Sequence, residues 1–87
     1  GLWLKIEQAI KEKRRETFER PFRGLTVQEI ADRWGTDKTG SIQTTLNKAS
    51  KDTTKRKATF IKVKHGYWDV KSEVEEDKRI ASMEIKY

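Results

Sequence analysis

The residues best suited to chemistry in this chain are amide, hydroxyl and lysine side chains between residues 41 and 51. A helix is expected over about residues 41–52, because Ile42, Leu46 and Ala49 recur at helical spacing and form one apolar face. The opposite face holds Ser41, Gln43, Thr44, Asn47, Lys48 and Lys51. Amides of this kind make paired hydrogen bonds to adenine, and a threonine methyl contacts thymine. The pattern predicts a helix that reads base edges in the major groove of DNA, with an ordinary solvent-exposed face as the alternative.

Basic side chains follow this helix closely. Residues 51–71 hold seven Lys or Arg and two Asp, a balance of +5, whereas residues 72–87 carry a balance of −2. Such a segment attracts a polyanion, although a solvated face is again the alternative. Phosphate contacts are expected from Lys51, Lys55, Arg56, Lys57, Lys62 and Lys64, with His65 near the minor groove. A second candidate set of phosphate contacts is Arg14, Arg15, Arg20 and Arg23.

Catalysis and metal binding lack the residues that they need. The chain has one histidine and no cysteine, which excludes thiol nucleophiles, zinc–cysteine clusters and multi-histidine sites. His65 lies at an expected exposed turn with only Asp69 as a nearby orienting group. Gly35 and Gly40 match neither the dinucleotide-binding nor the Walker pattern. We therefore expect no enzymatic activity, no cofactor and no metal.

The composition fits one small domain. The chain has 87 residues, of which 39% are charged and 33% hydrophobic, and its formal net charge is +6. The hydrophobic core must therefore be lean. No apolar run approaches the roughly 20 residues of a membrane span, and no leader sequence is seen. We expect no membrane contact and an intracellular location, in the cytoplasm or at the nucleoid or nucleus.

Two further helices are expected before residue 41. The first carries an apolar stripe that includes Trp3 and Ile6, extends toward Arg20 and must end at Pro21, beside which Phe18 and Phe22 are expected to enter the core. The second begins with the capping box of residues 26–29, Thr-Val-Gln-Glu, and ends at Gly35. The three tryptophans, Trp3, Trp34 and Trp68, are interpreted as packing residues.

Residues 60–70 are expected to form a β-hairpin. Two β-rich runs flank His65-Gly66, a plausible two-residue turn. This turn pairs Lys64 with Tyr67, Val63 with Trp68 and Ile61 with Val70. The side chains expected in the core are then Ile61, Val63, Trp68 and Val70, and those expected on the outer face are Phe60, Lys62, Lys64, Tyr67 and Asp69.

The end of the chain, residues 72–87, is expected to be a tail or linker outside a domain of residues 1–71. Residues 73–79 look helical or disordered, and the alternation of Ala81, Met83, Ile85 and Tyr87 with polar residues is typical of a strand. This segment could therefore add a third strand to the hairpin.

The order of three helices followed by a hairpin predicts an α+β fold of the winged helix-turn-helix type. The segments Leu25–Ala31 and Phe60–Val70 resemble the HARE-type winged helix-turn-helix family over residues 2–71. That family includes the N-terminal domain of the bacterial RNA polymerase delta subunit and domains fused to restriction endonucleases and chromatin regulators. The resemblance implies contact with DNA or a nucleoprotein, in transcription or restriction, and no catalysis by the domain itself.

Two functions remain open from the sequence. The first is a double-stranded DNA-binding module that uses the helix at residues 41–52, the basic loop and the hairpin. The alternative is a protein-interaction module that docks a polymerase or another nucleoprotein partner. This alternative stays open because the winged-helix fold does not by itself determine function. Its contacts would come from Phe60, Tyr67 and the C-terminal tail.

Overall fold

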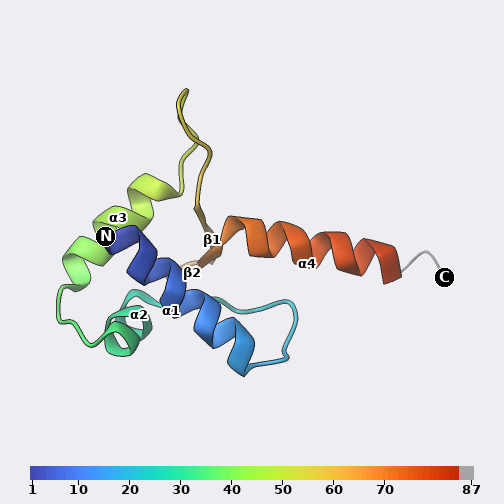
Figure 1. Cartoon of the computed structure of the whole chain (residues 1–87), viewed down its shortest axis with the longest axis horizontal. Coiled ribbons are helices and arrows are strands. Elements are labelled where there is room, and N and C mark those ends of the chain that lie inside the picture. Colours follow the sequence, from blue (N-terminus) through green and yellow to red (C-terminus); the bar gives the residue numbers. More distant parts are fainter. Residues whose placement is uncertain (85–87) are drawn as a thin grey trace.

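The computed structural model describes residues 1–84 as four helices and one two-stranded antiparallel sheet (Figure 1). The order is α1 (Leu2–Glu16), α2 (Val27–Trp34), α3 (Thr39–Ala49), β1 (Phe60–Lys64), β2 (Tyr67–Val70) and α4 (Lys71–Glu84). The expectation of a small α+β fold is confirmed. The expectation of three helices is wrong, because residues 71–84 form a fourth helix.

The core lies between α1, α2, α3 and one face of the hairpin. Its largest fully buried apolar side chains are Trp68, Phe60, Ile6, Ile10, Leu25, Ile30, Ile42 and Leu46. Trp3 and Trp34 are half-buried and pack against this cluster. All three tryptophans are thus packing residues, as expected, and Trp68 is the most buried of them.

The connection between α1 and α2 differs from expectation. Helix α1 ends at Glu16, because Thr17 is extended with φ −128° and ψ 142°. Phe22 is buried as predicted, but Phe18 is 95% exposed and the prediction that it enters the core is wrong. The guanidinium groups of Arg14 and Arg20 lie 5.0 and 5.9 Å from the Phe22 ring, so one aromatic side chain already fills the space beside α1.

Capping residues at both ends of α2 determine where this helix begins and ends. The Glu29 N–H donates to the Thr26 hydroxyl at 3.1 Å, and the Thr26 N–H donates to the Glu29 carboxylate at 3.0 Å. Gly35 adopts the left-handed conformation, with φ 81°, and its N–H donates to the Ala31 carbonyl at 2.8 Å. The predicted capping box and the predicted stop are both confirmed.

The hairpin follows the predicted register only at its turn. Lys64 pairs with Tyr67, but a bulge at Val63 shifts the rest by one residue, so that Lys62 pairs with Trp68 and Phe60 with Val70. The predicted pairs of Val63 with Trp68 and of Ile61 with Val70 are therefore wrong.

The bulge changes which side chains face the core. Phe60 faces the core and is fully buried. Ile61 and Val63 are only half-buried on the second face of the sheet, and Asp69, the partner of Ile61 in the ladder, is fully buried there. The exposed positions predicted for Phe60 and Asp69, and the core positions predicted for Ile61 and Val63, are wrong. One physical reason is the large Phe60 ring, which fills the core beside Trp68. Another is Arg14 of α1, which pairs with Asp69 at 3.0 Å.

Helix α4 begins directly after β2 and runs away from the other helices (Figure 1). Ala81 and Met83 are helical, so the predicted third strand is wrong for residues 81–84, and Ile85 and Tyr87 lie outside the described residues. Glu73 and Asp77 lie one turn apart and both approach Arg14, which fixes the start of α4 against α1. Ile80 and Met83 are exposed.

Candidate functional site

Helix α3 presents the amide-bearing face to solvent. Ile42 and Leu46 are fully buried and Ala49 is 2% exposed, which confirms the predicted inward face. The side chains on the outward face are all exposed: Ser41, Gln43, Thr44, Asn47 and Lys48. The helix spans Thr39–Ala49, so it begins and ends slightly earlier than the predicted range. Lys51 consequently lies beyond the helix.

The outward face of α3 is ordered by bonds along the helix. The Gln43 amide donates to the Asn47 amide oxygen at 3.4 Å, and the Thr44 hydroxyl donates to the Gly40 carbonyl at 3.0 Å. The two amides therefore lie one turn apart on a single stripe. Both can exchange their mutual bond for bonds to another donor and acceptor, such as a base edge.

Residues 50–59 form a projecting segment that we call the arm (Figure 1). Thr53 and Arg56 exchange two backbone hydrogen bonds, at 2.7 and 3.3 Å, which closes a tight turn at its tip. At its base the Thr59 N–H donates to the Ala49 carbonyl at 2.8 Å. The basic side chains of the arm are all exposed: Lys51, Lys55, Arg56 and Lys57.

One side-chain contact orders the arm internally, and another joins it to α1. Asp52 accepts a hydrogen bond from the Ala58 N–H at 2.7 Å, and this bond, together with Lys71, lowers the pKa of the Asp52 carboxyl. The Arg56 guanidinium lies 4.1 Å from the centre of the Trp3 ring. Trp3 was expected only to pack in the core, and no local sequence pattern identifies it as the platform for Arg56.

The hairpin adds three more exposed side chains to those of α3 and the arm. Lys62, Lys64 and His65 are exposed, and Gly66 has φ +80° in the turn. Lys64 lies 4.4 Å from the Tyr67 ring and Lys62 lies 5.2 Å from the Trp68 ring. The ammonium groups themselves thus lie over the aromatic rings, in cation–π contacts, while both residues remain exposed.

All the excess charge of the chain lies on this part of the molecule. Residues 39–66 contain seven Lys or Arg and one Asp, so seven minus one gives +6, which equals the formal charge of the whole chain. The remaining residues contain thirteen basic and thirteen acidic side chains and balance to zero. We call the exposed side chains of residues 39–66 the basic surface. The residues predicted at the base edges and the first set of predicted phosphate contacts, with His65, all belong to it.

The second predicted set of phosphate contacts does not form as expected. Arg14 is 5% exposed and donates to the Asp69 carboxylate at 3.0 Å, so its assignment as a phosphate contact is wrong. Arg23 binds Glu29 through two hydrogen bonds of 3.1 and 2.7 Å, and Arg20 lies 3.6 Å from Asp77. Arg20 and Arg23 are therefore paired with acids but remain exposed, and Arg15 is exposed as well, so only the assignment of Arg14 is contradicted.

Burial and contacts with arginines shift the pKa values of two of these acids. The Arg23 side chain, with help from the Thr26 backbone, lowers the pKa of Glu29 to about 2. Burial raises the pKa of Asp69, although the Val70 N–H, at 2.7 Å, and Arg14 oppose that rise. Asp69, Glu73 and Asp77 therefore serve internal contacts, with Arg14.

Phe60, predicted to contact a protein partner, is fully buried, and that assignment is wrong. Tyr67 is half-buried beneath Arg23 and Lys64.

Among the described residues, no helix combines the length and the apolar character needed to cross a bilayer. The same part of the chain contains no group of three or more His, Cys, Asp or Glu side chains that could hold a metal ion.

Comparisons with known proteins find no matching family model, no similar curated protein and no similar solved structure.

Proposed function

We propose that the chain is a winged helix-turn-helix module that binds double-stranded DNA, with α3 in the major groove. The observation that carries the proposal is the basic surface, which contains the whole net charge of the chain and has an amide-bearing helix face at its centre. The helix order, the capping box of α2 and the hairpin support membership of the HARE-type winged helices. Helix α4 is an addition to that pattern.

Helix α3 suits the major groove because its exposed face is polar and free of large apolar side chains. Gln43 and Asn47 provide paired donors and acceptors for base edges, and Thr44 provides a methyl group beside them. Lys48 continues the same stripe toward the arm. Sequence preference is therefore expected to depend on the two amides.

The arm and the hairpin suit the phosphates on either side of α3. Six cations are exposed, Lys51, Lys55, Arg56, Lys57, Lys62 and Lys64. Three of them, Arg56, Lys62 and Lys64, lie over aromatic rings. In helix-turn-helix proteins such flanking groups position the recognition helix without reading sequence. Six phosphate contacts would give a slope of log affinity against log salt of about −5.

The experiment is a fluorescence anisotropy titration of a labelled 20-base-pair duplex with the full chain at 50, 100 and 200 mM salt. Affinity is expected to fall about a thousandfold over this range. Lys55→Glu combined with Lys57→Glu is expected to weaken binding to all sequences and to reduce the slope by about 2. Lys5→Glu is the matched control, because Lys5 is exposed on α1 outside the basic surface.

Sequence reading is tested separately with a panel of duplexes. Asn47→Ala is expected to relax the preference at one base pair, at a cost of about 1 to 3 kcal/mol for the preferred duplex. The absence of binding at 50 mM salt would refute the proposal. An equal loss of affinity in the Lys5→Glu control and in the arm variants would refute the assigned surface.

A further inference from the structure

Strand β1 is apolar on both of its faces, and this pattern has no role in the proposed DNA interface. Phe60 faces the core and is fully buried, while Ile61 and Val63 on the second face are only half-buried. A strand with apolar side chains on both faces is typical of a sheet that is covered on both sides. Here Arg14 of α1 pairs with Asp69 on the second face, while Ile61 and Val63 on that face stay half-buried.

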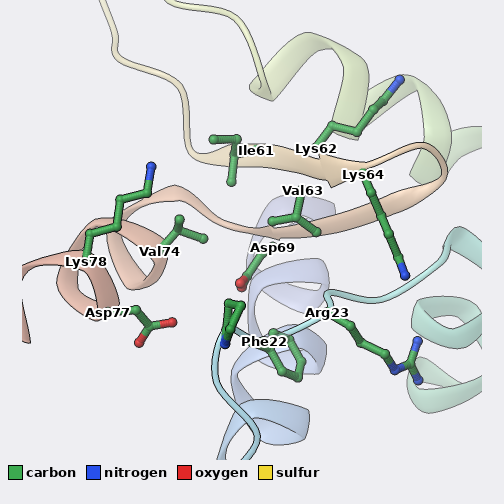
Figure 2. A pocket seen from close by; sticks show the side chains of 11 residues that line it. Phe22, Arg23, Ile61, Lys62, Val63, Lys64, Asp69, Val74, Asp77 and Lys78 are labelled. Carbon is green, nitrogen blue, oxygen red and sulfur yellow. The ribbon is translucent and has the colours of Figure 1, made fainter. Parts of the chain in front are cut away.

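The second face borders a groove of about 540 Å³ between the hairpin, residues 21–23 and the start of α4. Figure 2 shows Ile61 and Val63 extending into this space from β1, with Val74 on the α4 side and Phe22 below them. The volume is large enough for several side chains of a ligand. The walls are apolar where the sheet and α4 face each other, because Ile61, Val63 and Val74 line them.

The charge at the groove is positive. Its two acids, Asp69 and Asp77, are both paired with Arg14, and Arg23 is paired with Glu29. Lys64 and Lys78 lie at opposite ends of the groove (Figure 2), and no carboxylate of the described residues lies within 4 Å of either ammonium group. An occupant of this groove therefore meets an apolar middle and a free cation at each end.

We propose that the groove binds an acidic, amphipathic segment of a partner protein. Its apolar side chains would pack on Ile61, Val63 and Val74, and carboxylates on either side of them would pair with Lys64 and Lys78. A nucleic acid supplies negative charge but no aliphatic side chains for the middle of the groove. The proposal does not rest on DNA binding, because the apolar walls of the groove lie on the second face of the hairpin. The groove shares Lys62 and Lys64 with the proposed phosphate contacts.

The probe is a labelled ten-residue peptide with four central Leu, Ile or Val residues and three Asp or Glu residues at each end. Three matched peptides replace the central residues by Ser, replace the acids by Lys, or keep acids at one end only. Titrations use the full ¹⁵N-labelled chain and follow amide chemical shifts. Shift changes are expected at residues 21–23, 61–64 and 74–78. Affinity is expected to be at least about tenfold lower for the Ser and Lys peptides.

Two variants test the contacts. Lys78→Glu is expected to weaken binding of the acidic peptide about three- to tenfold, since it replaces an exposed attraction by a repulsion. Val74→Asp is expected to abolish detectable binding, and circular dichroism checks that the variant remains folded. If Val74→Asp unfolds the chain, Val74→Ala takes its place and is expected to weaken binding. Lys5→Glu and Lys48→Glu are the charge-matched controls and are expected to leave peptide affinity unchanged.

Several results would overturn the proposal. Shift changes confined to α3 and the arm would show that the peptide binds the basic surface as a generic polyanion. Equal affinity for the Ser peptide would show that the apolar walls make no contribution. Binding of dodecanoate without binding of the peptide would assign the groove to a small amphipathic anion. The two proposals can fail separately. If Lys48→Glu loses DNA binding and keeps its affinity for the peptide, the two ligands bind at different surfaces.

Discussion

The substitution Arg14→Met tests the arrangement that joins α1, β2 and α4. The Arg14 guanidinium donates to Asp69 at 3.0 Å, to the Glu73 carbonyl at 3.3 Å and also to the Asp77 carboxylate. Arg14 is 5% exposed and Asp69 is fully buried. Methionine keeps the unbranched stem of the side chain but lacks the guanidinium, which leaves the Asp69 carboxylate buried without its counter-charge.

The expected loss is large for a domain of this size. Removing one partner of a buried ion pair costs about 3 to 5 kcal/mol. At about 0.05 to 0.15 kcal/mol per residue, a chain of 87 residues has a total stability of roughly 4 to 13 kcal/mol. With a urea m-value near 1 kcal/mol/M, the unfolding midpoint should fall by about 3 M or more.

The pH dependence of the variant identifies Asp69 as the source of the loss. Burial already raises the pKa of Asp69, and removal of Arg14 raises it further. Where Asp69 is protonated in the folded variant and ionised in the unfolded chain, the folded state binds one more proton. Stability then falls as pH rises, by up to about 1.4 kcal/mol per pH unit, from the ordinary pKa of Asp69 up to its raised value.

The assay is urea unfolding followed by circular dichroism between pH 4 and pH 8. Arg15→Met is the control, because Arg15 is the exposed neighbour of Arg14, and its loss should stay within about 0.5 kcal/mol. Adding Asp69→Asn to Arg14→Met should remove the new pH dependence and restore part of the stability. A loss below about 1 kcal/mol for Arg14→Met, or a pH dependence that persists in the double variant, would refute the reasoning.

Two further predictions concern the ends of α2 and the approach of the α1–α2 connection to the sheet. The pKa of Glu29 is lowered from 4.5 to about 2, so its stabilisation is complete above pH 4.5 and is lost as the pH falls toward 2. Glu29→Gln should cost about 1 kcal/mol at pH 7, since the side chain is 37% exposed and solvent screens the pair; an unchanged acid transition in urea titrations at pH 7 and pH 3 would contradict this. Gly24→Ala should destabilise by at least about 1 kcal/mol more than Gly66→Ala in thermal unfolding. Both positions have φ near +80°, but only at Gly24 would a Cβ lie 2.8 Å from the Trp68 carbonyl oxygen, and equal losses would contradict this difference.

The sequence predicted the parts of the candidate site that depend on one element. The inward stripe of α3 and its exposed amide face follow from helical spacing, and both were predicted correctly. The exposure of Lys55, Lys57 and His65 was also expected, because a basic loop and a tight turn cannot be buried without partners. The contact between Arg56 and Trp3 was not predicted, since 53 positions separate them in the chain and neither shows a local signal.

The failed predictions share one cause. The alternation and the turn of residues 60–70 predicted one register, but the structure has a bulge at Val63, with Phe60 buried in the core and Asp69 buried against Arg14. These long-range contacts are not visible in the local pattern. Likewise, the alternation of residues 81–87 indicated a strand, but residues 81–84 continue a helix whose start is fixed by Arg14.

By itself, the sequence determined the ends of α2, the orientation of α3, the turn at His65-Gly66 and the concentration of charge in residues 39–66. These features depend on backbone capping, side-chain period and charge within short segments, so few residues decide each of them. Tertiary structure alone decided the register of the hairpin, the burial of Asp69 and the direction of α4. Those features rest on a contact between residues 55 positions apart, whose free energy appears only when α1 and β2 pack together.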